Sequence, residues 1–174
     1  MKRLITIALF STMINIFGFG QNRIGGIRFP KDEFMVASTS IDGLPAVVVV
    51  NSAMNKFKAR DVFGWYLSLI IDYNELSENG MPTPEESQFV MDYFETLDAG
   101  IRGDVNRPNA VFIARETHNG NLHAIWQVNN PELANQYLQG IINGESYPRE
   151  MEFIMEYDAT WKESDIYLEL ARRK

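Results

Sequence analysis

The chain contains no cysteine among its 174 residues. That absence excludes disulfide bonds, a thiolate nucleophile, zinc–thiolate sites and a lipid-attachment cysteine at a signal junction. Histidine is almost as scarce, so any chemistry that needs imidazole depends on His118 and His123 alone. We therefore expect no cofactor and no metal ion, and a domain whose stability comes from its apolar core.

Positive charge is also in short supply. The chain has 16 Lys and Arg against 23 Asp and Glu, and two of the basic residues lie in the first 20 positions, so the rest carries a net charge of −9 with neutral histidines. A surface this acidic repels phosphate backbones and anionic lipid headgroups. We therefore expect a protein or small-ligand partner, and neither nucleic acid nor a membrane surface.

One long apolar run stands at the start of the sequence. Lys2 and Arg3 precede an apolar segment over residues 4–17, and small residues follow where signal peptidase reads them. The run is shorter than the about 20 residues that span a bilayer. These features predict a cleavable signal peptide over residues 1–20 and a mature protein, beginning at Gln21, that is periplasmic or secreted. An uncleaved anchor or a buried first strand is the alternative.

The remainder divides into a short lead-in and one domain. Residues 21–33 contain glycine and proline without periodicity, which predicts an extended segment. Residues 34–174 are enough for one domain with a sizeable core and too few for two.

Two β-hairpins are predicted by dipeptides that accept the positive φ angles of a type I′ turn. These dipeptides are Asp42-Gly43, between strands 34–41 and 44–50, and Asn119-Gly120, between strands 109–117 and 121–128. Further strands are expected at 62–73 and 149–158. Pro45 lacks an N–H, so its strand should lie at a sheet edge or leave that position unpaired.

Two helices are predicted where a capping residue precedes proline. Thr83-Pro84 is followed by Glu86, which completes the pattern of a capping box, and Asn130-Pro131 repeats the cap and the proline. Gly100 or Gly103 should end the first helix, and glycine also follows the second. A short last helix is expected to begin near Thr160.

The order of these elements predicts an α+β fold. Strand, helix, strand, strand, helix, strand is the ferredoxin-like βαββαβ order, with two helices on one face of an antiparallel sheet. The additional N-terminal β-hairpin would extend the sheet edge or cover part of the open face, and a short C-terminal helix would follow. The sequence leaves the placement of the hairpin open.

Four short segments also stand out as motifs: Asp42-Gly43-Leu44-Pro45-Ala46 in a run ending at Asn51, Gly80-Met81-Pro82-Thr83-Pro84-Glu85-Glu86, Phe94-Glu95-Thr96-Leu97-Asp98, and Asp158-Ala159-Thr160-Trp161. Together they resemble the bacterial domain-of-unknown-function family 695. The likeness covers residues 34–170. Its motifs are turn and capping devices, so the resemblance implies a fold and no catalytic residue.

Candidate site residues come first from the second hairpin. With a two-residue turn, Glu116 pairs with His123 and His118 with Asn121, which places all four side chains on one sheet face. Two imidazoles and a carboxylate are possible ligands of a divalent transition metal. An ordinary cross-strand pair at an exposed hairpin tip is the favoured interpretation, since such a tip offers few supporting side chains.

A second candidate is the acidic face of the strand at 149–158, whose members are Glu150, Glu152, Glu156 and Asp158. They would stand beside Asp72 if this strand and the one at 62–73 are neighbours. Paired carboxylates serve glycosidases, but evenly spaced carboxylates on an alternating strand are typical of a solvated face. Met151, Phe153, Met155 and Tyr157 should face the helices.

Aromatic residues are the last candidates. Trp65 and Trp126 are expected in the core, with Trp126 opposite Ile113, whereas an exposed Trp161 would suit a carbohydrate or protein contact. No nucleophile elbow, phosphate-binding loop or dinucleotide fingerprint occurs. The favoured hypothesis is an exported, non-catalytic binding or regulatory module. The alternative is a small hydrolase, with glycans as one candidate substrate class, that uses carboxylates of the open sheet face.

Overall fold

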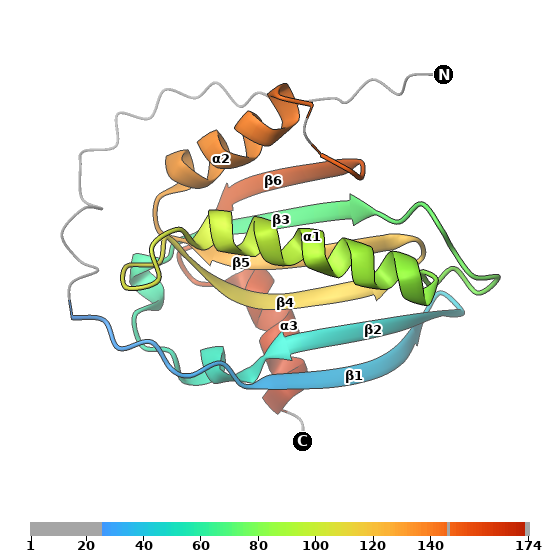
Figure 1. The fold of residues 1–174 in the computed structure, drawn as a ribbon. Coiled ribbons are helices and arrows are strands. Elements are labelled where there is room, and N and C mark those ends of the chain that lie inside the picture. The colour runs from blue at the N-terminus through green and yellow to red at the C-terminus, as the bar shows by residue number, and fades with distance from the viewer. Residues whose placement is uncertain (1–25, 146, 173–174) are drawn as a thin grey trace.

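A computed structural model of the chain describes residues 26–145 and 147–172, so the predicted signal peptide lies outside the described residues. Within them, three α-helices flank a six-stranded antiparallel sheet, and the fold is α+β (Figure 1). The strands are β1 (Phe34–Ile41), β2 (Leu44–Asn51), β3 (Trp65–Asp72), β4 (Ala110–His118), β5 (Asn121–Val128) and β6 (Met151–Tyr157). The helices are α1 (Pro84–Arg102), α2 (Pro131–Asn143) and α3 (Lys162–Arg172), with 3₁₀ helices η1 (Ser52–Lys56) and η2 (Arg60–Val62) before β3.

The strands lie in the order β1-β2-β4-β5-β3-β6. Both predicted hairpins are confirmed, and their turns have the positive φ angles that the dipeptides allow: 50° at Asp42, 81° at Gly43, 44° at Asn119 and 83° at Gly120. The first hairpin extends the sheet beside β4, which settles the placement that the sequence left open. The strand predicted from residue 62 begins later, because residues 60–62 form η2.

Pro45 lies on an interior strand rather than at an edge, since β2 pairs with both β1 and β4. Its partner across the hairpin is Ser40, and the pairing of β2 with β4 begins one residue later, at Ala46 opposite His118. The missing N–H therefore falls beyond the end of β4. The second of the two expectations for Pro45, an unpaired position, is the correct one.

The helix starts follow the predicted caps. Thr83 Oγ1 accepts a hydrogen bond from Glu86 N at 3.3 Å, and Asn130 Oδ1 accepts from the first backbone amides of α2. Gly103, at φ 68°, ends α1. The reciprocal bond of a capping box is absent, because Thr83 N donates to Glu75 O and the Glu86 carboxylate binds other partners.

Helices α1 and α2 cover one face of the sheet and form what we call the first core. Its fully buried members include Leu67, Leu69, Leu97, Leu122, Trp126 and Leu138. The alternation predicted for β6 is present at Met151, Phe153 and Met155, which pack into this core. Tyr157, the fourth residue predicted there, is 70 % exposed at the end of the strand, where its ring contacts Trp65. Trp126 lies opposite Phe112 instead of Ile113, because a β-bulge at Ile113 shifts the register of β4 against β5.

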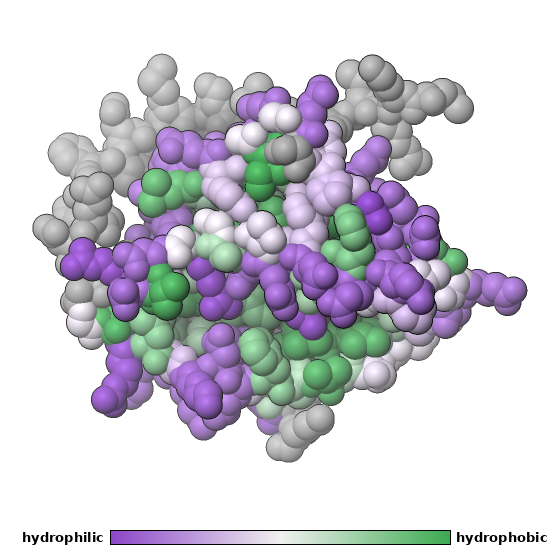
Figure 2. All heavy atoms as spheres, in the orientation of Figure 1, coloured by the Kyte–Doolittle hydropathy of each residue, from purple (hydrophilic) through white to green (hydrophobic). Residues whose placement is uncertain are grey.

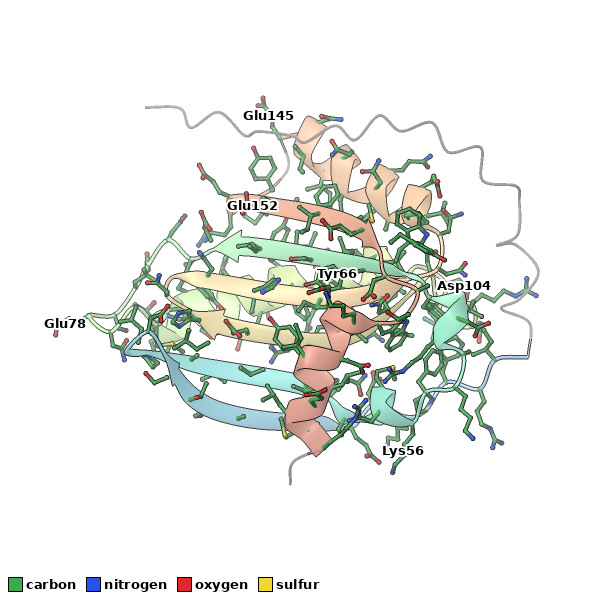
Figure 3. The ribbon with its side chains drawn as sticks, turned by 180° about the vertical axis from the view of Figure 1, so that it is seen from behind. Lys56, Tyr66, Glu78, Asp104, Glu145 and Glu152 are labelled. Atoms are coloured by element: carbon green, nitrogen blue, oxygen red, sulfur yellow. The ribbon has the colours of Figure 1, made fainter. Side chains whose placement is uncertain are left out.

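The opposite face of the sheet is covered, whereas the order of elements had predicted an open face. Helix α3 and η1 cover it over β2, β4 and β5 and form the second core (Figures 1 and 3), which contains Val48, Val50, Phe57, Phe63, Ile113, Ile125, Trp161 and Leu168. A positive φ of 62° at Trp161 turns the chain into α3 immediately after β6. Residues Trp161, Ser164 and Leu168 then form a buried helical stripe, which the short last helix was not expected to supply.

Candidate functional site

The predicted cross-strand pairs at the second hairpin are present. Glu116 lies opposite His123, and His118 lies opposite Asn121. With Ile70 and Asn119 these four residues line an open hollow of about 180 Å³ at the end of the sheet. His118 is held in place by its Nδ1 atom, which lies 3.2 Å from Pro45 O. The hairpin tip is therefore a small polar recess rather than a flat surface.

His123 also has a partner that the hairpin pattern did not predict. Its Nε2 atom lies 2.7 Å from Ser68 Oγ on the neighbouring strand β3, and the ring of Tyr167 from α3 meets its ring edge-on at 6.4 Å. Burial lowers the pKa of His123, and the nearby Glu116 carboxylate opposes that shift. Ser68 lies on the same face of the sheet as His123, and the strand order β5-β3 brings the two side chains together.

Serine, histidine and a carboxylate are the residue types of a hydrolase triad, but the surroundings here do not provide the rest of such a site. A triad needs backbone N–H groups that point at the developing oxyanion. Strand β3 is paired with β5 on one side and β6 on the other through Ser68, so the nearby backbone amides belong to the sheet ladder. Among the described residues, moreover, no three His, Asp or Glu side chains are grouped so as to hold a metal ion.

The acidic residues of β6 separate into two groups. Glu150, Glu152 and Glu156 are exposed at the outer edge of the sheet, where β6 pairs with β3 as the hypothesis required. Figure 3 shows Glu152 on this edge, away from α3. Asp72 N donates to Glu150 O at 2.9 Å, so a backbone hydrogen bond joins the end of β3 to the residue before β6.

Asp158 has a structural role instead. Its carboxylate is buried and accepts hydrogen bonds from Lys162 N at 2.8 Å, Glu163 N at 3.2 Å and Gln127 Nε2 at 3.2 Å. These bonds satisfy amides of the first turn of α3, so Asp158 caps the helix that was expected to begin near Thr160.

Trp161 is also not a surface residue. It is fully buried in the second core, and its Nε1 atom donates to Phe63 O at 2.8 Å and to Arg60 O at 3.1 Å. The Arg60 guanidinium covers its ring at 4.7 Å. The hypothesis of an exposed Trp161 is wrong because α3 folds back over the sheet.

An apolar cavity of about 290 Å³ lies between the lead-in, the end of α1 and the start of β4. Apolar side chains form most of its wall, including Phe29, Met54 and Phe112, and Asp32 and Arg102 lie at its polar side. Arg102 is held there by Asp98 at 2.8 Å and by Asp32 at 3.7 Å. No sequence motif pointed to this cavity, whose walls come from the lead-in, η1, the end of α1 and the start of β4.

The last feature of functional interest is the outer edge of β1, with which no other strand of the described residues pairs. Its eight residues, Phe34–Ile41, include no charged residue and no proline. Phe34 and Val36 are 57 % and 58 % exposed on the face that carries α1, beside the half-buried Val47 and Val49 of β2. Figure 2 shows apolar side chains gathered over these two strands, beyond the cover of α1. We call Phe34, Val36, Val47 and Val49 the hairpin patch.

Comparison with known proteins gives one match. The model of a family described as "Family of unknown function (DUF695)" matches residues 32–170. The chain belongs to this family. DUF695 membership confirms the resemblance drawn from the turn and capping motifs, and the match extends from the lead-in through most of α3. No curated protein and no solved structure matches this DUF695 chain.

No helix in the described part of this DUF695 chain combines the length and the apolar character needed to cross a bilayer.

Proposed function

We propose that this DUF695 chain is a non-catalytic binding module that holds a protein partner by adding an extended segment of that partner to β1. The observation that carries the proposal is the unprotected edge of this strand. Strand addition supplies affinity through main-chain hydrogen bonds and specificity through alternate side chains.

The backbone geometry of the first hairpin defines which groups are free. In a two-residue hairpin the residues flanking the turn, Ile41 and Leu44, exchange hydrogen bonds, and every second pair after them does the same. The bond from Ser52 N to Glu33 O, 2.7 Å long, continues this series. The N–H and C=O groups of the intervening residues therefore point outward, and these are Phe34, Val36, Ser38 and Ser40.

The two edges of the sheet differ in protection. Natural sheets block their edges with charged side chains, proline, bulges or very short strands. Strand β6 carries Glu152 and Glu156 at exposed positions, whereas β1 is eight residues long and has none of these devices. Within a chain of net charge −7, an uncharged edge of this length supports a role in binding.

The arrangement of the other elements supports a ferredoxin-like relation for residues 65–157. The strand order β4-β5-β3-β6, with α1 and α2 on one face, has the pattern expected for the βαββαβ order. We propose that the β1–β2 hairpin and α3 are additions to that unit. Such sheets commonly leave an edge or a face for partners.

We also propose that the protein works in the periplasm or outside the cell, on the basis of residues 1–20. N-terminal sequencing of the exported protein should find Gln21 first. A soluble cytosolic product that retains residues 1–20 would contradict export.

The hydrolase alternative receives less support. A glycosidase needs two carboxyl groups about 5 to 10 Å apart across a cleft. The polar recess contains one carboxylate, Glu116, and the apolar cavity contains one, Asp32. The exposed glutamates of β6 stand on an edge, with α3 covering the neighbouring face.

A synthetic peptide tests strand addition directly. We expect an uncharged peptide of about nine alternating threonine and valine residues to slow the hydrogen exchange of the Val36, Ser38 and Ser40 amides, which point to solvent in the free chain. Ser38→Pro removes one outward N–H without touching the bonds to β2, so it should abolish this protection. Ser38→Ala keeps the N–H and is the matched control. The proposal fails if the peptide protects none of these amides, or if it binds Ser38→Pro as well as Ser38→Ala.

A further inference from the structure

We infer that the partner of β1 is a second copy of this chain, paired antiparallel to it about a two-fold axis normal to the sheet. This inference rests on the proposed function and names the partner for the same edge. The two sheets would join into one continuous sheet with the β1 strands at its centre.

The outward groups define a single best register for this pairing. The backbone N–H and C=O groups that point outward belong to the even-numbered residues Phe34, Val36, Ser38 and Ser40. The two-fold axis must therefore place even-numbered residues of one copy opposite even-numbered residues of the other. With Ala37 opposite Ala37 of the second copy, Val36 faces Ser38 and Phe34 faces Ser40. Every outward N–H and C=O group from Phe34 to Ser40 then forms a hydrogen bond between the two copies. A shift of the register by two residues would leave such groups unpaired at one end of β1.

Charge directs a second copy of this acidic chain to β1 rather than to β6. Two copies of an acidic protein repel each other over most of their surfaces. Pairing β6 with β6 would bring together edges that carry exposed glutamates, while the eight residues of β1 are uncharged and the like-charged Asp32 and Asp42 would face each other only beyond the two ends of the strand. A basic partner, in contrast, would be drawn to the glutamates of β6 rather than to β1.

The hairpin patch adds apolar contact to the strand pairing. An axis normal to the sheet keeps both patches on the face that carries α1. In the register centred on Ala37, the two Val36 side chains are diagonal neighbours across the junction, within reach of each other. The patches of both copies, each with Phe34 57 % and Val36 58 % exposed, therefore meet in one apolar band.

The size of the contact predicts a weak dimer. One strand and its flanking side chains bury less than the about 1,200 Å² of a standard interface. We expect sedimentation analysis of the full chain and of the chain without residues 1–20 to show a monomer–dimer equilibrium in the range of about 1 to 100 μM. Ser38→Ala should keep this equilibrium, and Ser38→Pro should be monomeric at the same concentrations. A protein that stays monomeric throughout, or a Ser38→Pro dimer, overturns the inference.

Single cysteines test the register, because the chain has none of its own. Residues directly opposite in a pair without hydrogen bonds have Cα atoms about 4.5 Å apart, close enough for a disulfide. Ala37→Cys should therefore cross-link to a covalent dimer under mild oxidation. Thr39→Cys, whose opposite residue is Met35, should cross-link far less. The reverse ranking, or equal yields, would mean that β1 does not pair in this way.

The outcomes separate this inference from the proposed function. Peptide protection of the outward amides together with a monomeric chain keeps strand addition and rejects the second copy. Absence of both rejects both proposals. Protection that occurs without peptide, only when residues 1–20 are retained and in a monomer, would assign the edge to that segment and reject the second copy.

Discussion

Glu86 is a buried carboxylate that forms an ion pair with Arg149. It is 3 % exposed, and its carboxylate accepts two hydrogen bonds of 2.7 Å from Arg149 and one of 2.8 Å from Asn74 N. The Arg149 guanidinium also lies over the ring of Phe89 at 4.2 Å. This group ties the start of α1 to the start of β6 and to the loop after β3.

Glu86→Gln should lower the free energy of unfolding by about 2 kcal/mol, because Arg149 would lose its counter-charge in a confined site. Glu85→Gln, at an exposed position on the same helical turn, is the matched control and should change stability by less than about 0.5 kcal/mol. Urea denaturation at neutral pH measures both. Equal effects of the two substitutions would contradict a special role for Glu86.

The ion pair between Glu86 and Arg149 also predicts that the stability of the fold depends on pH. Hydrogen bonds from Arg149 hold the pKa of Glu86 below its usual value, so the folded state releases this proton more readily than the unfolded state. The resulting stabilisation is complete above the ordinary carboxyl pKa of about 4.3 and is lost as the pH falls through the lowered value. The difference between wild type and Glu86→Gln should therefore shrink in acid.

His123 predicts a second pH effect in a higher range. Burial lowers its pKa, so below about pH 6.5 the unfolded state binds a proton that the folded state resists. Stability should fall as the pH drops from about 7 towards 5. His123→Gln should flatten this part of the profile, with His118→Gln as the control at the other histidine of the recess. An unchanged slope in His123→Gln would show that another group titrates.

At the scale of elements, β6 offers a test of its register. Replacing Glu150, Glu152 and Glu156 together by Gln should leave the fold intact, since all three side chains are exposed. Met151→Gln should cost about 2 to 4 kcal/mol, because a polar amide would enter the first core. Thermal unfolding compares the two proteins. A triple variant that unfolds while Met151→Gln does not would place the wrong face of β6 against the helices.

Local signals in the sequence were sufficient for most elements. Asp42-Gly43, Asn119-Gly120 and Thr83-Pro84 act through backbone angles within a few residues, and the structure has both turns and the cap where they were predicted. Contacts between residues far apart in the sequence could not be predicted in this way. Glu86 fits a capping box by spacing, yet Arg149, 63 residues later, takes its carboxylate.

The candidate site shows the same division. The pairing of Glu116 with His123 followed from turn length alone, while the contact of His123 with Ser68 required knowledge that β5 lies beside β3. Asp158 and Trp161 were misplaced because their burial depends on where α3 packs. A helix with an apolar stripe can cover either of two faces, and the stripe does not specify which.

At the scale of the whole molecule, the sheet separates two cores of different origin. The first is closed by α1 and α2, and the second by α3 with η1 and Phe29 from the lead-in. Both cores are built on the strands of one sheet. Unfolding of one core would therefore expose apolar side chains on strands that still pack into the other core. We therefore expect the two to unfold together.

Leu168→Ala tests this coupling. Leu168 lies on the inner side of α3 and is fully buried, so the substitution should cost about 2 to 4 kcal/mol, whereas Leu170→Ala, at 40 % exposure on the same helix, should cost less than half as much. Unfolding of Leu168→Ala should remain a single transition when it is followed by the fluorescence of Trp126 in the first core and of Trp161 in the second. Two separate transitions would show that the cores are independent.

The position of α3 also has a consequence for the order in which the molecule can be completed. Leu168 O accepts a hydrogen bond from Asn55 Nδ2 across 113 residues of sequence, and Arg172 Nε donates to Asn55 Oδ1. During synthesis, Phe57 and Phe63 stay uncovered until α3 has left the ribosome. For a chain exported as we propose, that delay would leave the second core incomplete while the polypeptide passes through a translocation channel. A nascent chain stalled before α3 should accordingly be held by chaperones that recognise exposed apolar segments.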